Sequence, residues 1–128
     1  MELRRYRKNH RLKPEIVESS VFVAFWAEDK AVFGIDAAGV DWMLCSEFTL
    51  RVLEDGDKDL TRTHRSSLVR VGAVDRTMQR HNPSKSHHEA YCVILGREFS
   101  ISRACKNTFF FRYHAHVSKH GFATAAAA

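Results

Sequence analysis

Three short apolar segments separated by turn-forming residues dominate the first half of the chain. Residues 21–26 (VFVAFW), 31–35 (AVFGI) and 40–44 (VDWML) are rich in β-branched and aromatic side chains, which favour strands. The intervening residues 27–30 (AEDK) suit a hairpin loop, and residues 36–39 (DAAG) suit another turn. The pattern therefore predicts a β-hairpin followed directly by a third strand.

The second half of the chain continues this pattern. Turn signals at Asn82-Pro83 and Gly96-Arg97 separate further apolar runs. These runs predict strands over residues 68–71, 89–95 and 98–102. We therefore expect a mainly β chain without internal repeats.

One segment departs from the strand period. Between residues 45 and 57 (CSEFTLRVLEDGD) the apolar residues are spaced more as in a helix, and they are Phe48, Leu50, Val52 and Leu53. Ser46 is the expected N-cap and Gly56 the expected end. The aromatic segment 109–113 fits either a strand or a helix. One or two short helices are therefore expected, the clearest over residues 46–54.

Length and composition fit one folded domain. The chain has 128 residues, of which 45% are hydrophobic and 27% charged. Neither an apolar run of about 20 residues nor an apolar segment after the basic start is present, so we expect no membrane span and no secretory signal. Cys45, Cys92 and Cys105 are odd in number and widely spaced, which predicts reduced, buried thiols. These features predict a cytoplasmic protein.

Positive charge is concentrated at the start of the chain. The net charge is +5, and residues 1–13 hold six lysines and arginines against Glu2 alone. A basic balance favours a polyanionic partner such as nucleic acid, although many basic domains bind nothing charged. Residues 1–19 are therefore either a basic arm that follows phosphates, with Arg5 as a contact, or a frayed terminus. Residues 118–128 are expected to form a flexible tail.

Catalytic and metal-binding patterns are missing from the sequence. It contains no Gly-rich phosphate loop, no G-x-S-x-G and no H-E-x-x-H, so we expect no enzyme. His81 and the SHHE segment at residues 86–89 lack the fixed spacing of a structural zinc site. His114 and His116 alternate like outward-facing strand residues. We expect no metal or cofactor, and a solvated, dispensable turn at residues 81–88.

Two polar corners carry the strongest functional signal. His64, Arg65 and Ser66 lie at a bend between the expected helix and the next strand, and Ser102-Arg103 end a later strand. Arginine at a strand end can donate two hydrogen bonds to guanine in the major groove of DNA, with histidine or serine as secondary contacts. Alternatively, Ser66 or Ser67 satisfies the bend and the arginines pair with Asp59 or Glu98.

The order of these segments resembles the LytTR family of DNA-binding domains. That family has an R-x-H-R-S-x-[LIV]-V segment, matched here by Arg62, His64, Arg65, Ser66 and Val69. Its later [LIV]-x-[LIV]-S-R segment is matched by residues 100–103, and residues 48–55 (FTLRVLED) resemble the helix before the first motif. The resemblance covers residues 20–112, and we take residues 20–117 as the domain.

The resemblance implies an elongated fold of antiparallel β-sheets with one or two short helices, whose loops enter the major grooves of double-stranded DNA. Family contacts come from three places, which map here to a first loop, the H-R-S corner and the S-R corner. The implied DNA-binding residues are Asp29 and Lys30; His64, Arg65 and Ser66; and Arg103, Lys106 and Asn107. The first loop is shorter and more acidic here than is usual in the family.

The resemblance also sets the functional alternatives. Family members commonly regulate transcription and carry a receiver domain before the DNA-binding domain. Only about twenty residues, basic in composition and without a receiver's acidic pocket, precede it here, so phosphorylation-controlled dimerisation is not expected within this chain. We expect a regulator that binds DNA by sequence, alone or as a dimer on repeated half-sites. The alternative is a protein-interaction module of the same fold, such as a phage or mobile-element protein that binds a host regulator.

Overall fold

The computed structural model describes residues 1–7, 10–81 and 88–121. The strands and helices follow one another in the order β1 (Glu2–Arg7), β2 (His10–Glu18), β3 (Phe22–Glu28), β4 (Ala31–Asp36), β5 (Asp41–Leu44), α1 (Leu50–Gly56), β6 (Leu60–His64), β7 (Ser67–Arg70), β8 (Arg76–His81), β9 (His88–Ile94), β10 (Arg97–Ile101) and α2 (Arg103–His120). Single 3-10 turns, Ser19–Val21 and Val71–Ala73, precede β3 and follow β7.

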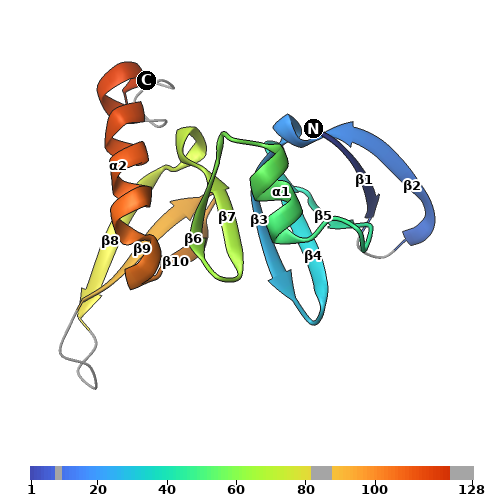
Figure 1. Cartoon of the computed structure of the whole chain (residues 1–128), viewed down its shortest axis with the longest axis horizontal. Helices are drawn as coiled ribbons and strands as arrows, with labels where there is room; N and C mark the ends of the chain where they lie inside the picture. The colour runs from blue at the N-terminus through green and yellow to red at the C-terminus, as the bar shows by residue number, and fades with distance from the viewer. Residues whose placement is uncertain (8–9, 82–87, 122–128) are drawn as a thin grey trace.

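The strands form two antiparallel sheets. The larger has seven strands in the order β2-β1-β5-β4-β3-β7-β6, and the smaller has three in the order β10-β9-β8. The molecule is elongated, with the small sheet and α2 at one end and the β1–β2 hairpin at the other (Figure 1). This confirms the expected fold of mainly antiparallel β-sheet.

Strands β3 and β7 contribute to two hydrophobic cores because successive side chains of a strand point to opposite faces. Phe25 and Leu68 lie in the core beneath α1, whereas their neighbours Ala24 and Val69 lie in the core shared with the small sheet and α2. All four are fully buried. The position of α2 is thus fixed relative to the large sheet by the same strands that hold α1.

Helix α1 begins four residues after the expected N-cap. The chain turns at residues 45–48, where Phe48 N–H donates to the Cys45 carbonyl over 3.0 Å, so Ser46 lies outside the helix. Thr49 caps α1 instead, since its hydroxyl accepts from Val52 N–H at 3.2 Å. The apolar spacing identified the helix but not its first turn.

Helix α2, with 18 residues, is the longest helix of the described chain. The sequence predicted only short helices and took residues 46–54 as the clearest one, so the length of α2 was not predicted. Phe109 and Tyr113 are buried one helical turn apart, and Val117 packs against the same core. This i, i+4 spacing is the period of a helix face. His114 and His116, expected on a strand, lie on this helix.

The expected basic arm is instead part of the large sheet. β1 pairs with β2 on one side and with β5 on the other, and Leu3 is fully buried. Three positive charges of this region are paired: the N-terminal ammonium with Glu18, Arg4 with Glu47 and Arg5 with Glu15. Similarly, the expected tail from residue 118 begins within α2, which continues to His120.

The cysteines are free thiols, and Cys45 and Cys92 are buried as expected. Burial raises the pKa of Cys92 to about 12. Cys105 is half-buried on α2. Among the described residues, no helix is long and apolar enough to span a membrane.

Candidate functional site

Three chain reversals lie along the lower side of the molecule in Figure 1. They are the β3–β4 turn at Asp29 and Lys30, the β6–β7 turn at Arg65 and Ser66, and the junction of β10 with α2 at residues 102–103. We call this side of the molecule the recognition edge. It carries residues from all three of the loops that were expected to form the site.

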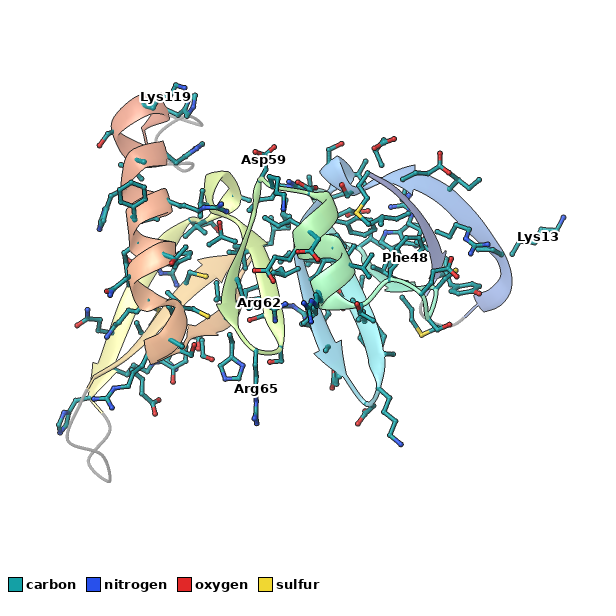
Figure 2. All side chains as sticks on the ribbon, in the orientation of Figure 1. Lys13, Phe48, Asp59, Arg62, Arg65 and Lys119 are labelled. Atoms are coloured by element: carbon teal, nitrogen blue, oxygen red, sulfur yellow. The ribbon has the colours of Figure 1, made fainter. Side chains whose placement is uncertain are left out.

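The β6–β7 turn separates inward from outward side chains in the polar cluster His64–Ser67. Ser67 is buried, and its hydroxyl lies 2.5 Å from that of the fully buried Thr63. His64 Nδ1 lies 2.9 Å from Ser66 Oγ and accepts from Ser66 N–H at 3.3 Å. Arg65 is exposed and projects away from the tip of the hairpin (Figure 2). The fold thus uses three of these residues to shape the turn and presents the fourth to solvent.

The guanidinium of Arg62 stabilises the same turn from behind. Its Nη1 donates to the Arg65 carbonyl at 2.9 Å, and its Nε donates to Glu54 of α1 at 3.0 Å. Figure 2 shows Arg62 between the hairpin and α1. Arg62 therefore connects the α1 helix to the backbone that carries Arg65.

Backbone hydrogen bonds hold the β6–β7 turn against its neighbours. Ala27 N–H donates to the Ser66 carbonyl at 2.9 Å, and Ser102 N–H donates to the Thr63 carbonyl at 2.8 Å. The first bond fixes the turn to β3, and the second fixes it to the start of α2. The two polar corners identified in the sequence are therefore adjacent parts of one rigid surface.

The start of α2 presents Arg103, Lys106 and Asn107. Arg103 and Asn107 are exposed, and Lys106 is half-buried. Ser102 is the N-cap, and its side chain makes no capping hydrogen bond. The unpaired N–H groups at a helix start carry a partial positive charge that favours anions. The local field thus adds to the charge of the two cationic side chains.

The β3–β4 turn is tight and polar. Asp29 and Lys30 have φ values of 50° and 64°, the left-handed conformation that a two-residue hairpin turn of type I′ requires. Both residues are exposed, as is Glu28 before them. Between this hairpin, the β6–β7 turn and β10 lies a shallow hollow of about 290 Å³. This part of the recognition edge carries both signs of charge.

Arg5, the other expected contact, lies away from the recognition edge. Its side chain is only 12% exposed and pairs with Glu15 at 3.0 Å. Its guanidinium carbon lies 3.6 Å from the centroid of the Trp42 ring. Arg5 therefore packs within the large sheet, and its expected role as an arm residue does not match this position.

Two further arginines belong to strands of the small sheet. Arg80, near the end of β8, is exposed, stacks on Tyr91 at 4.8 Å and pairs with Glu98 at 2.5 Å. Arg97 stacks on Trp26 at 4.0 Å and donates to Asp41 at 3.0 Å. Arg80 was not among the expected contacts, although it also lies near a strand end, which was the signal used for Arg103.

Of the histidine-containing turn expected at residues 81–88, residues 82–87 lie outside the described residues, whereas His81 ends β8 and His88 begins β9. Within the described ranges, no group of three or more histidine, cysteine, aspartate or glutamate side chains could hold a metal ion. The recognition edge instead presents the hydrogen-bond donors Arg65, Arg103 and Asn107 next to the mixed charges of the β3–β4 turn. Such donors can bind anions or the edges of nucleotide bases.

Comparisons with known proteins agree with the fold. The chain is similar in structure to the LytTr DNA-binding domain of a Bacillus cereus protein described as a methyl-accepting/DNA response regulator, with a TM-score of 0.64. The two share 16% sequence identity over 88% of this chain and 94% of the other. No family model and no curated protein matches the sequence. The likeness establishes a LytTR-type fold.

Proposed function

We propose that this chain, which has a LytTR-type fold, binds double-stranded DNA by sequence and thereby regulates transcription. The observation that carries the proposal is the convergence of Arg65, Arg103 and Lys30 on one edge, each at a chain reversal. The similar Bacillus cereus domain is described as DNA-binding. The recognition edge is the surface that would meet the duplex.

The β6–β7 hairpin would supply the contact to bases. The major groove is about 12 Å wide and admits a two-stranded β-ribbon. Arg65 lies at the tip of such a ribbon, and its backbone is held by Arg62 and by Ala27. An arginine presented in this way can donate to both O6 and N7 of guanine, the commonest specific contact to DNA. Arg65 is therefore proposed to determine one base of the target site.

The start of α2 and the β3–β4 turn would contact phosphates. Arg103 and Lys106 combine their charges with the positive end of an 18-residue helix. Asn107 adds a neutral donor, and Lys30 adds a cation from the neighbouring hairpin. Contacts to phosphate position a protein on the duplex without carrying sequence information. These residues are proposed to fix the depth and angle at which Arg65 enters the groove.

Random-site selection with the purified full chain tests this proposal. We expect an enriched motif, and we expect affinity for it to fall steeply with added salt because several phosphates are contacted. Lys119→Ala is a matched control, since this exposed lysine lies at the opposite end of α2 from the recognition edge (Figure 2). Failure to enrich any motif, with binding equally weak on all DNA, would contradict sequence recognition.

A protein partner is the second candidate for the recognition edge. Glu28 and Asp29 are both exposed beside Lys30, and carboxylates repel phosphate. A partner of mixed charge would suit this surface better than a uniform polyanion. Binding that changes little with salt, to a protein rather than to any DNA, would favour this alternative.

A further inference from the structure

Phe111 is the most exposed large hydrophobic side chain of the described residues. Its relative exposure is 77%, whereas Phe109 and Tyr113 on the same helix are 0% and 5% exposed. Single exposed apolar side chains are ordinary on protein surfaces, so the exposure alone indicates nothing. The surroundings of the ring carry the argument.

Two hollows with shared lining residues lie on this side of α2, and Phe111 lines the smaller one. One, of about 450 Å³, lies between α1 and the first turns of α2, and the other, of about 230 Å³, includes Phe111 and Ala115 in its wall. Both share Lys58, Thr61 and Arg112. The surface thus combines an exposed aromatic ring with nearby hollows that could accommodate an aromatic ring of another molecule.

Arg112 lines both hollows and is held by three hydrogen bonds. Its Nη1 donates to the carbonyls of Lys58 and Leu60 at 3.3 and 3.0 Å and to the Thr61 hydroxyl at 3.0 Å. All three acceptors are neutral, so these bonds orient the guanidinium without neutralising its charge. These bonds hold the part of α2 that carries the neighbouring Phe111 against residues 58–61.

The charges around the larger hollow are of both signs. Asp55 of α1 forms an acidic wall beside Glu54, whose charge is paired with Arg62, and Lys58 and Arg112 form a basic wall. Asp55 and Lys58 are exposed. A partner of a single charge sign would leave one of these walls opposed by like charge.

We propose that the occupant of this surface is a second copy of the same chain. In a two-fold contact the same patch meets itself, so each ring can enter a hollow of the other copy while the acidic wall of each copy meets the basic wall of its partner. We call this patch the α1–α2 face, defined by Asp55, Lys58, Phe111 and Arg112.

The larger hollow reaches Arg62, Ala104 and Cys105 near the recognition edge, but the recognition-edge residues Arg65, Arg103 and Lys106 line neither hollow. Phe111 lies eight residues after Arg103, which corresponds to about 12 Å along α2. Two associated copies would therefore each keep a start of α2 available for binding. Regulators with repeated half-sites require this separation between the self-association surface and the base-contacting surface.

The contact is expected to be weak in solution. A phenylalanine ring buries only about 150–250 Å², whereas stable interfaces bury about 1,200–2,000 Å² in total. Neighbouring sites on one DNA molecule would raise the effective concentration of the second copy to about the millimolar range. Self-association itself does not depend on the proposed DNA binding, and it can be measured without DNA.

Sedimentation of the full chain over a roughly thousandfold concentration range, up to about 1 mM, tests the ring. We expect a reversible monomer–dimer equilibrium whose dissociation constant rises at least about tenfold in Phe111→Ser. Ile16→Ser is the matched control, because Ile16 is 64% exposed and lies on β2 at the far end of the molecule. It should associate like the parent. A parent that stays monomeric throughout, or equal association of Phe111→Ser, would overturn the proposal.

Charge exchange tests whether the contact is self-complementary. Asp55→Lys makes both positions 55 and 58 basic, and Lys58→Asp makes both acidic. Each variant alone should dimerise less than the parent, and an equimolar mixture should recover association as a mixed dimer. Unchanged association of the single variants, or no recovery in the mixture, would contradict the paired walls. Thermal melting of each variant verifies folding.

Discussion

Asp57 and Arg70 form an ion pair in which Arg70 Nη2 lies 2.6 Å from Asp57 Oδ2, with both side chains at most 16% exposed. Arg70 also donates to the carbonyls of Phe22 and Ser19, at 2.6 and 2.7 Å. The Ser19 hydroxyl in turn donates to Asp57 at 2.6 Å. This network joins the end of α1 to β3 and β7 at the base of the hairpin that carries Arg65.

The pair makes stability depend on pH. Burial alone would raise the pKa of Asp57, but the hydrogen bonds from Arg70 and Ser19 outweigh it and lower the pKa to about 2 from an ordinary 3.8. Because the folded value is the lower one, the ionised carboxylate stabilises the fold above about pH 4 by about 2 kcal/mol. That contribution should be lost as the pH falls from 4 toward 2.

Asp57→Asn removes this contribution and leaves Arg70 without a counter-ion. We expect the free energy of unfolding at neutral pH to fall by about 2–4 kcal/mol, and its acid dependence to flatten. Asp59→Asn, two residues along and exposed, is the control and should change stability by less than about 0.5 kcal/mol. Equal melting of the two variants would contradict the role given to the pair.

Substitution of Phe109 by alanine should destabilise the fold far more than the same substitution of the exposed Phe111. Phe109 is fully buried against the core shared with the small sheet, so its removal should cost about 3–5 kcal/mol by creating a cavity. Phe111→Ala should cost less than about 1 kcal/mol at concentrations where the chain is monomeric. Chemical denaturation of both variants measures the two free energies of unfolding. A similar loss of stability in both would contradict the burial of Phe109 and the exposure of Phe111.

Arg5→Ala should affect stability rather than DNA affinity. Its guanidinium stacks on Trp42 and pairs with Glu15, and loss of both contacts should lower the free energy of unfolding by about 1–2 kcal/mol. The salt dependence of DNA binding should remain as in the parent. A salt slope reduced by about one, with unchanged stability, would instead indicate the phosphate-contacting arm that the sequence suggested.

Ser66 and Ser67 should respond oppositely to alanine substitution. Ser67→Ala leaves the buried Thr63 hydroxyl without its partner and should cost about 1–3 kcal/mol of stability. Ser66→Ala should leave stability within about 1 kcal/mol of the parent but weaken DNA binding, because Ser66 bonds to His64 at the turn. Melting and binding measured on the same samples distinguish these roles, and a stable Ser67→Ala would refute the assignment.

The strands from β3 to β5 and from β9 to β10 could be predicted because local pattern and tertiary packing agree there. Their turn residues and alternating apolar side chains point to the same structure. The segment of α2 was ambiguous, since Phe109, Phe110 and Phe111 in succession favour strands locally. A helix lets Phe109 and Tyr113, one turn apart, both face the core that they share with the small sheet. This tertiary contact is not visible in the local sequence.

The N-terminal segment could not be predicted because two of its arginines pair with carboxylates that lie outside residues 1–13. Arg4 meets Glu47 from beyond β5, and Arg5 meets Glu15 across the β1–β2 hairpin. A count of positive charge over residues 1–13 contains neither partner. The positions of Arg65 and Arg103 next to strand ends were sufficient to predict that both side chains are exposed. The hydrogen bond from Ser102 N–H to the Thr63 carbonyl, which joins the two corners, could not be predicted.

The most direct test of the central claim is binding of Arg65→Ala and Arg103→Ala to the selected DNA site and to scrambled DNA at two salt concentrations, with Lys119→Ala as control and thermal melting as a check on folding. Arg65→Ala should lose about 1–3 kcal/mol on the selected site and relax preference at one base pair. Arg103→Ala should weaken binding to both DNAs alike and lower the salt slope by about one. If both variants fold normally and bind the selected site like the parent, the recognition edge does not bind DNA.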